Sequence, residues 1–372
     1  MRHKIKVLTI FGTRPEAIKM APLVKELQRR EDDFASIVCV TAQHRSMLDQ
    51  VLDAFKIVPQ YDLNIMKPNQ SLVDISVNAL AGLESVIKEV QPDIVLVHGD
   101  TSTTFFGSLA AFYQQVMIGH VEAGLRTHNK YSPFPEEANR QLTGVLADLH
   151  FAPTEAAAAN LLAENKNPDN IYVTGNTVID SFATTVRENY THPILEEIKP
   201  HRMVLVTAHR RENLGEPMTS IFSAIKRIVE EHEEISVVFP VHLNPRVQQL
   251  AQEILGHSPR VKLIEPLDVI DFHNFEARAH LILTDSGGLQ EEAPSFGVPV
   301  LVLRNTTERP EGIAAGTLRL VGTNEQTIYE HANELLTNRA SYEQMAHATN
   351  PYGDGKASGR IADILLQRFQ DK

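Results

Sequence analysis

The sequence predicts an α/β protein with two doubly wound parallel sheets. Strand-like and helix-like segments alternate from end to end, which is typical of repeated βαβ units. The strand-like segments are short, unbroken and rich in Val and Ile, as in parallel strands covered by helices on both faces. The alternation restarts after a polar, proline-bearing connector, "YTHPILEEIKP". The 372 residues suffice for two domains or one large one.

The first half of the sequence is predicted to contain five pairs of a strand followed by a helix. Each apolar run is followed within a few residues by a helix-like segment. Pro15 stands where the first helix should begin, because proline suits the first helical position. The predicted strands lie at 6–12, 36–42, 93–100, 116–124 and 149–153, and the helices begin near residues 15, 45, 102, 135 and 154.

A sixth pair, strand 171–176 and helix 177–189, precedes the connector. A second series of strands then begins. We therefore predict two Rossmann-like domains, 1–175 and 176–355. Ligands bind at the carboxyl ends of parallel strands, so two such domains are expected to enclose a cleft. The second-series segments are "MVLVTAHRREN", "SVVFPVHLNP", "VKLIEP", "LILTDSGG" and "VPVLVLRN".

Composition excludes several classes of protein. The net charge of −12 argues against general nucleic-acid binding. No run of eighteen apolar residues is present, so no membrane span is predicted, and the start lacks the features of a signal peptide. The single cysteine, Cys39, cannot form an internal disulfide. A reducing cytoplasm fits this composition.

Polar residues gather directly after the predicted strands. The carboxyl ends of parallel strands share one edge of a sheet, so these residues favour a common site over isolated caps or turns. They are Gly12-Thr13-Arg14, His98-Gly99-Asp100, Glu122 with Arg126, His209-Arg210-Arg211-Glu212, His242 and Asp285-Ser286-Gly287-Gly288.

The segment "TDSGGLQEEAP" is the strongest phosphate-binding candidate. Glycines let backbone N–H groups approach an anion, and a helix N-terminus favours negative charge. A simple Ser286 N-cap is the alternative interpretation. Glu292, one helical turn later, is a candidate for binding ribose hydroxyls. The alternative is that it is a solvated acid on the helix surface. Arg14 suits a diphosphate because its donors form a planar fork, or it pairs with Glu16 at the surface.

Several known motifs are missing from the sequence. It has no HExxH, no cysteine cluster, no GxSxG and no GxxxxGK[ST], and GxGxxG does not follow the first strand. A metal site, a P-loop and a dehydrogenase are therefore not expected, and no cofactor is predicted.

The segment "HVEAGLRTHNKYSPFPEEANR", 120–140, is unusually rich in charge for a stretch between a buried-looking strand and a helix. Such density often marks a solvated loop. The alternative is that its acidic and basic side chains are held in place to take part in catalysis.

With these motifs together, the chain resembles the non-hydrolysing UDP-N-acetylglucosamine 2-epimerases of bacteria. The resemblance covers nearly the whole length. It implies a GT-B architecture, a homodimer, and a last helix, 356–372, that packs back on the first domain. It rests on "FGTRPEAIKMAPL", "VTAQHR", "VLVHGDT", "GHVEAGLRT", "YSPFPEEANR", "VTGNTVID", "HRREN", "PVHLNP", "LTDSGGLQEEAP", "TTERPEG" and "NPYGDG".

The resemblance also implies roles for individual residues. Catalysis would involve Lys19, Asp100, Glu122, Glu136, Arg140 and His209. The substrate would be held by Arg14, Lys19, Leu267, Phe272, Ser286, Gly287, Gly288, Glu292 and Arg309, with Leu267 and Phe272 at the uracil. A second UDP-GlcNAc would act as an activator at Gln43, His44, Glu136, Arg210 and His242.

The implied reaction is reversible epimerisation of UDP-GlcNAc to UDP-ManNAc by elimination and re-addition of UDP, supplying ManNAc units for cell-surface polysaccharides. The resemblance does not identify which carboxylate removes the C2 proton. A glycosyltransferase, a hydrolysing epimerase and a non-enzymatic nucleotide-sugar sensor remain alternatives. The sensor is disfavoured, because it needs no cluster of Asp100, Glu122 and Glu136.

Overall fold

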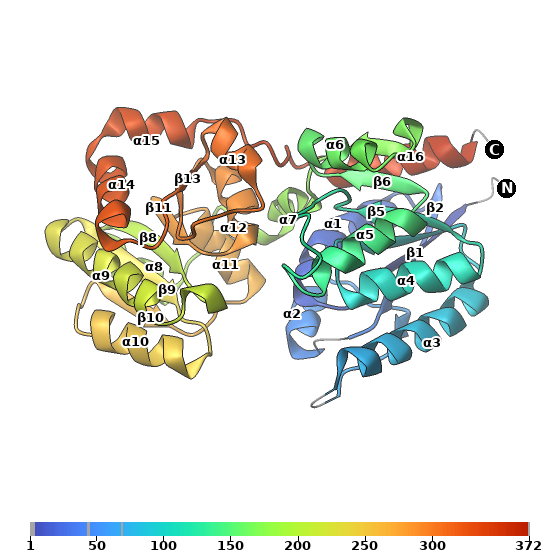
Figure 1. Ribbon diagram of the computed structural model, residues 1–372, viewed down its shortest axis with the longest axis horizontal. Helices are drawn as coiled ribbons and strands as arrows, with labels where there is room; N and C mark the ends of the chain where they lie inside the picture. Colours follow the sequence, from blue (N-terminus) through green and yellow to red (C-terminus); the bar gives the residue numbers. More distant parts are fainter. Residues whose placement is uncertain (1–3, 43–44, 68–69, 371–372) are drawn as a thin grey trace. The chain divides into compact units, whose positions relative to one another are not determined.

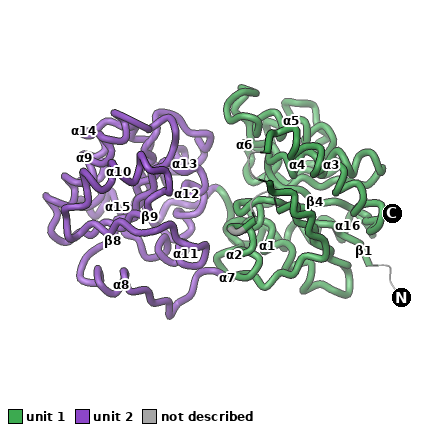
Figure 2. Tube along the Cα trace, turned by 90° about the horizontal axis from the view of Figure 1, so that it is seen from below, with its two compact units in different colours: residues 1–184, 352–372 green, residues 185–351 purple. Residues whose placement is uncertain are grey.

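A computed structural model describes residues 4–42, 45–67 and 70–370. The chain divides into two compact units (Figure 2). Unit 1 contains residues 1–184 and 352–372, and unit 2 contains residues 185–351. The domains predicted from the sequence ended at residues 175 and 355. The chain thus passes from unit 1 to unit 2 and back again.

Unit 1 has a seven-stranded parallel sheet in the order β3-β2-β1-β4-β5-β6-β7 (Figure 1). The strands are β1 (Ile5–Phe11), β2 (Phe34–Val40), β3 (Tyr61–Asp62), β4 (Ile94–His98), β5 (Met117–Val121), β6 (Leu149–Ala152) and β7 (Ile171–Val173). The helices are α1 (Arg14–Arg29), α2 (Arg45–Phe55), α3 (Leu72–Val90), α4 (Ser102–Tyr113), α5 (Glu136–Leu146), α6 (Glu155–Ala163), α7 (Thr177–Thr185) and α16 (Ala357–Gln370), with the 3-10 turn η1 (Pro168–Asn170).

The helices of unit 1 cover both faces of its sheet. Leu8 and Ile10 of β1 pack with the buried side chains of α3 and α4, while α1 packs against α2 and α16. Successive strand residues point to opposite faces, so a central strand buried on both sides is apolar throughout. This accounts for the unbroken apolar runs in the sequence.

Unit 2 has a six-stranded parallel sheet in the order β10-β9-β8-β11-β12-β13. The strands are β8 (Arg202–Thr207), β9 (Ile235–Pro240), β10 (Val261–Ile264), β11 (Leu281–Thr284), β12 (Val300–Val302) and β13 (Leu318–Leu320). The helices are α8 (Pro193–Ile198), α9 (Glu216–Glu231), α10 (Pro245–Leu255), α11 (Val269–Glu276), α12 (Gly287–Glu292), α13 (Pro310–Ala315), α14 (Glu325–Thr337) and α15 (Arg339–Ala346), with the 3-10 turns η2 (Arg211–Asn213) and η3 (Ala293–Phe296).

Strand β8 supports a separate core on each face of this sheet. Val204 and Val206 pack with α9, α10 and α14, whereas Met203 and Leu205 pack with α8, α11 and α12. The predicted fold class is confirmed: each unit is a doubly wound parallel α/β sheet. No helix among the described residues is long and apolar enough to span a bilayer.

The returning chain is fastened to unit 1 by buried polar contacts. Asn176 N donates to Tyr352 O at 2.7 Å, and Asp180 accepts the N–H groups of Ala357 and Ser358. Gly175 has φ +88°, and a Cβ there would lie 3.3 Å from the Cα of Gly353, so the two backbones approach closely because both residues are glycine. Helix α16 then packs against α1.

Candidate functional site

Two carboxylates of unit 1 follow neighbouring strands. Asp100 comes after β4, and Glu122 comes after β5 in a left-handed conformation (φ +60°). Glu122 forms an ion pair with Lys19 of α1 and accepts a hydrogen bond from Asn176 Nδ2 at 2.9 Å. The His98 Nε2 lies 3.7 Å from Glu122 Oε2. Lys19 and Glu122 are thus brought together by elements distant in the sequence.

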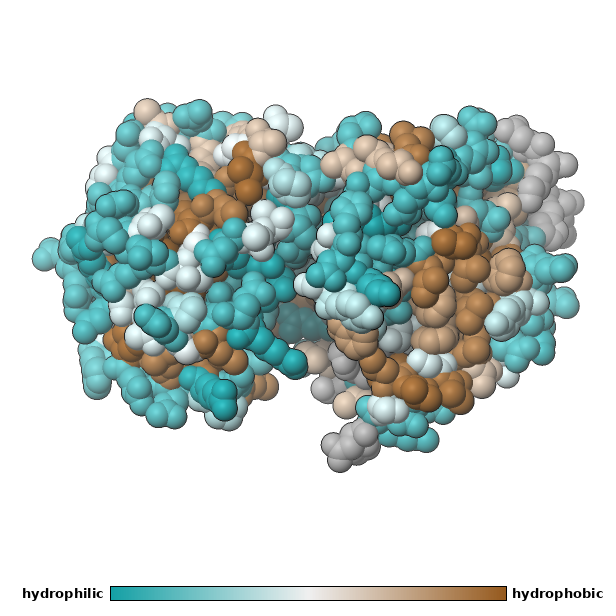
Figure 3. Space-filling view, in the orientation of Figure 1, coloured by the Kyte–Doolittle hydropathy of each residue, from teal (hydrophilic) through white to brown (hydrophobic). Residues whose placement is uncertain are grey.

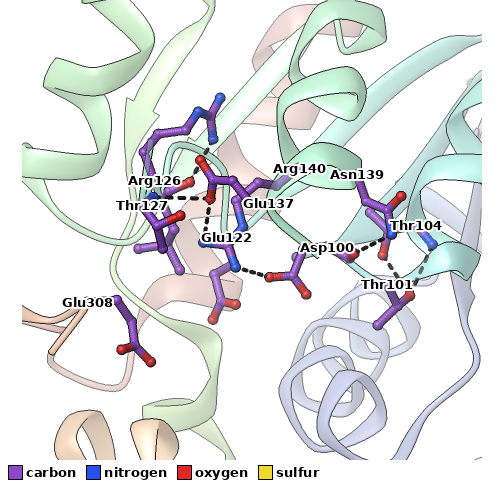
Figure 4. A network of polar contacts seen from close by, with 12 residues as sticks. Asp100, Thr101, Thr104, Glu122, Arg126, Thr127, Glu137, Asn139, Arg140 and Glu308 are labelled. Carbon is purple, nitrogen blue, oxygen red and sulfur yellow. Dashed lines mark hydrogen bonds and ion pairs between the residues drawn. The ribbon is translucent and has the colours of Figure 1, made fainter. Parts of the chain in front are cut away.

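Asp100 lies in a second group formed with α5 (Figure 4). Arg140 Nη2 donates to Asp100 Oδ2 at 2.5 Å, and Asn139 Nδ2 donates to the Asp100 carbonyl at 3.0 Å. Burial raises the pKa of Asp100, and the Glu122 charge adds to this, while Arg140 opposes it. Burial and Glu122 thus favour the protonated form of Asp100, whereas Arg140 favours its carboxylate.

The nearby histidines are held neutral. His98 and His120 are both buried, and burial lowers the pKa of His98 to about 4 and that of His120 to about 3. The His120 Nε2 lies 2.7 Å from the carbonyl oxygen of Gly99. Neutral imidazoles leave Lys19 and Arg140 as the cations in contact with Glu122 and Asp100.

Glu137 holds the charged loop between β5 and α5. Its side chain is fully buried and accepts the backbone N–H groups of Thr127 and His128, each at 3.1 Å. The neighbouring Glu136 is half-buried at the first position of α5. Glu137 is not among the site residues predicted from the sequence, because two adjacent acids look alike until the helix shows which one faces inward.

Glu16 joins the loop after β1 to the loop after β4. Its carboxylate accepts the N–H groups of Gly12 and Thr13, at 3.1 and 2.8 Å, and the hydroxyl groups of Thr101 and Thr104, at 2.7 and 3.2 Å. Four donors explain why this acid tolerates complete burial. The contacts fix Arg14, the first residue of α1, relative to the start of α4. Glu16 is therefore a buried structural acid rather than a surface partner of Arg14.

In unit 2, Arg309 lies against the start of α12. A Cβ on Gly287 would stand 2.6 Å from Arg309 Nη1, so a larger residue there would require the guanidinium to shift. Arg309 Nε donates to Glu291 and Nη1 donates to Glu308, both at 2.7 Å. The predicted residues Ser286, Gly287, Gly288 and Arg309 are therefore together at one strand end.

The loop after β8 is fastened by Asp285. This fully buried acid accepts the N–H groups of His209 and Arg210, at 2.9 and 2.8 Å, and the Asn213 side chain at 3.0 Å. The rings of His209 and His242 stack with centroids 5.6 Å apart. Burial lowers the pKa of His209, while Asp285 opposes this shift. Asp285 was noted in the sequence as a strand-end residue, but its anchoring role was not predicted.

The remaining predicted residues of unit 2 lie on or near α11 and α12. Phe272 and Leu267 are half-buried and pack on the core beneath α11, and Glu292 ends α12 beside His273. Of the predicted activator residues, Arg210 and His242 flank His209 in unit 2, and Glu136 lies in unit 1. Gln43 and His44 lie outside the described residues.

Comparisons with known proteins agree on one family. The family model described as UDP-N-acetylglucosamine 2-epimerase matches residues 25–366. A UDP-N-acetylglucosamine 2-epimerase of Bacillus subtilis is 65% identical over 366 residues, which are 98% of this chain and 96% of the relative. A crystal structure from Listeria monocytogenes, described as a 2-epimerase of the same kind, has a TM-score of 0.95 and 58% identity and covers 100% of this chain and 98% of its own.

A further relative was solved with a ligand. The Neisseria meningitidis UDP-GlcNAc 2-epimerase bound to UDP-GlcNAc is 51% identical with a TM-score of 0.89. The match covers 98% of this chain and 100% of the Neisseria chain.

Proposed function

Because the chain belongs to the UDP-N-acetylglucosamine 2-epimerase family and is therefore an epimerase, we propose that it interconverts UDP-GlcNAc and UDP-ManNAc by eliminating and re-adding UDP. The observation that carries the proposal is the pair of Asp100 and Glu122 on adjacent strand ends, each in contact with a cation. The UDP-GlcNAc found in the Neisseria relative supports the substrate.

The chemistry explains why such a pair is needed. The C2 hydrogen of the sugar is not next to a carbonyl group, so direct deprotonation is unfavourable. In the proposed elimination a base takes the C2 proton, the electron pair of the C–H bond forms the C1–C2 double bond, and the C1–O bond electrons leave with UDP. The intermediate is 2-acetamidoglucal. Re-addition with protonation on the opposite face of C2 gives the epimer.

Residues of unit 1 have the properties that proton transfer requires. Asp100 has a raised pKa, and the ion-paired carboxylate of Glu122 is suited to stabilising positive character at C1. Glu136 at the start of α5 is the third acid assigned to the sugar. Lys19 and Arg140 orient these carboxylates.

The nucleotide is assigned to unit 2, together with Arg14 of unit 1. Arg309 and the glycines at the start of α12 favour a diphosphate, because guanidinium groups and the N–H groups of a helix start both bind oxyanions. His209 is a further donor to the departing UDP. The full set is Arg14, His209, Leu267, Phe272, Ser286, Gly287, Gly288, Glu292 and Arg309.

The decisive experiment is proton NMR of the protein with UDP-GlcNAc in D2O. We expect UDP-ManNAc with deuterium at C2, because the abstracted proton exchanges with solvent. Free ManNAc and UDP would identify a hydrolysing enzyme. If no product formed until an acceptor sugar was added, a glycosyltransferase would be indicated and the epimerase proposal would fail.

We further infer a homodimer formed through an apolar face on α3, α4 and α5, which pack side by side. Figure 3 shows brown side chains gathered over these helices in unit 1. Val73 is 70% exposed and Val145 is 67% exposed. The exposed apolar side chains of this face are Leu72, Val73, Val77, Phe112, Tyr113, Leu142 and Val145.

A contiguous face of this kind usually marks an interface. We expect Val77→Glu to produce monomers in sedimentation velocity, whereas Val58→Glu, at an exposed valine outside the face, should leave the dimer intact. Monomeric wild-type protein at micromolar concentration would refute the dimer.

Three further inferences complete the proposal. The product supplies ManNAc units for cell-surface polysaccharides, and the enzyme works in the cytoplasm, where its buried thiol, Cys39, stays reduced. A second UDP-GlcNAc at Gln43, His44, Glu136, Arg210 and His242 activates turnover.

A further inference from the structure

Three titratable side chains meet on α11 and α12 of unit 2. His273 and Glu276 share one face of α11, being three residues apart, and Glu292 ends α12. One nitrogen or oxygen atom from each lies within 4.8 Å of the others. His273 and Glu276 are buried. Two carboxylates are thus placed together, and that of Glu276 is fully buried.

Glu276 has no hydrogen-bond donor for either carboxylate oxygen, although its side chain is fully buried. The titratable groups that face it are His273 on its own helix and Glu292 on α12. An ionised carboxylate in this position would be strongly unfavourable. Burial, and then the negative charge of Glu292, raise the pKa of Glu276 well above its usual range.

We propose that Glu276 and Glu292 share one proton, and that protonated Glu276 is a positioning residue for the Glu292 carboxylate. Like charges this close cannot both be ionised in a buried site, and one proton replaces their repulsion with a hydrogen bond. Glu292 then keeps its negative charge and a fixed orientation toward its ligand. The positioning role of Glu276 rests on the proposed function, in which Glu292 accepts hydrogen bonds from the ribose hydroxyls of the nucleotide.

His273 joins the carboxylate pair to the segment that enters unit 2. Its Nδ1 lies 2.8 Å from Thr185 Oγ1, and its Nε2 lies 3.8 Å from Glu292 Oε2. The next residue, Asn274, donates to Thr185 O at 2.7 Å and accepts the Arg187 N–H at 3.0 Å. These contacts fix α11, and with it the backbone of Glu276, against residues 185–187.

Infrared difference spectroscopy tests the shared proton on the full chain without any ligand. A protonated carboxyl group has a C=O stretching band distinct from the carboxylate bands. We expect this band in wild-type protein at neutral pH and its loss in Glu276→Gln. The matched control is Glu291→Gln, because Glu291 lies on the same helix as Glu292 but accepts a 2.7 Å hydrogen bond from Arg309. The control should leave the band in place.

Two results would overturn the shared proton. One is an unchanged acid band in Glu276→Gln. The other is a divalent metal bound at one equivalent per chain after exhaustive dialysis and lost in the same variant, because a cation would then balance the two carboxylates.

Calorimetric titration of UDP tests the positioning role. Glu276→Ala should weaken UDP binding about tenfold or more, since Glu292 loses the donor that orients it. Glu276→Gln should restore binding to within about threefold, because the amide still donates a hydrogen bond. Wild-type affinity in Glu276→Ala would overturn the positioning role. Unchanged affinity in Glu292→Gln would instead refute the nucleotide assignment, while the infrared result would still decide the shared proton.

Discussion

Arg140 donates a 2.5 Å hydrogen bond from Nη2 to Asp100 Oδ2, and its Nη1 lies 3.4 Å from Glu137 Oε2. One arginine therefore links an acid assigned to the chemistry with an acid that holds the loop. The two acids follow different strands of unit 1. Because α5 supplies both Glu137 and Arg140, its position controls the loop and the Asp100 carboxylate together.

The proposed catalytic acids predict a large loss of turnover without unfolding. We expect Asp100→Asn, Glu122→Gln and Glu136→Gln each to lower the rate about 10²–10⁴-fold, which is the usual contribution of general acid–base groups. The measurement is the initial rate by NMR, with a thermal melt of each variant. Glu155→Gln, on the exposed start of α6, is the control. Near wild-type turnover in all three variants would contradict the assignment.

The adjacent acids Glu136 and Glu137 should behave in opposite ways. Glu137→Ala leaves the N–H groups of Thr127 and His128 without their acceptor and should reduce the free energy of unfolding by roughly 1–3 kcal/mol. Glu136→Ala should reduce turnover with little effect on stability. Urea unfolding and NMR rates on both variants make the comparison. Equal stability of the two variants would show that Glu137 is not the anchor.

Nucleotide binding should depend on Arg14 and on His209. We expect Arg14→Ala and His209→Ala each to weaken UDP binding by roughly 1.5–3 kcal/mol, because each removes a hydrogen-bond donor assigned to the charged nucleotide. Calorimetric titration gives the affinity, and a thermal melt checks folding. Arg246→Ala, at an exposed arginine of α10, serves as the control. The assignment fails if both variants bind UDP as tightly as the wild type.

Buried His98 should make stability fall at acid pH. Its pKa is about 4 in the folded protein against 6.5 unfolded, so the unfolded chain binds the proton more readily. Stability is therefore complete above pH 6.5 and decreases as the pH falls toward 4. Between pH 7 and 5 this group accounts for about 2 kcal/mol. We expect urea midpoints of His98→Gln to show a weaker pH dependence than wild type, while those of exposed His257→Gln should match wild type.

The activator hypothesis predicts sigmoidal kinetics with UDP-GlcNAc. Pure UDP-ManNAc should show a lag or no turnover until a trace of UDP-GlcNAc is added. Couplings of this type are about 1–3 kcal/mol, or roughly 5–150-fold. Gln43→Ala and Arg210→Ala should reduce the response while nearly preserving UDP binding. Prompt, hyperbolic turnover of UDP-ManNAc alone would exclude the activator and leave the catalytic hypothesis standing.

The two sheets could be predicted from the sequence, because parallel strands that are buried on both faces form unbroken apolar runs. Strands β3 and β13 were not predicted, since two or three residues give no detectable pattern. Helix α3 was also missed. Strand-end positions led us to expect Asp100 and Glu122 near one another, and they follow the neighbouring strands β4 and β5; Lys19 of α1, assigned by the family resemblance, forms an ion pair with Glu122. This inference required the topology rule and the family resemblance together.

The supporting residues could not be predicted in the same way. Asn176 contacts Glu122 across 54 positions of sequence, and Glu276 meets Glu292 between two helices. Such contacts depend on how helices pack and which side chain of a polar pair faces inward. A single sequence records the residue types but not these orientations. Glu137 is the clearest case, since only its burial separates it from Glu136.

The interrupted path of unit 1 has a consequence for biosynthesis. On the ribosome, residues 1–184 emerge long before 352–372, and all of unit 2 is made in the interval. Until then Asp180 lacks the N–H groups of Ala357 and Ser358, and α1 lacks its contact with α16. Unit 2 is continuous and can fold as soon as it leaves the exit tunnel. The nascent unit 1 therefore remains incomplete until residues 352–372 have left the exit tunnel.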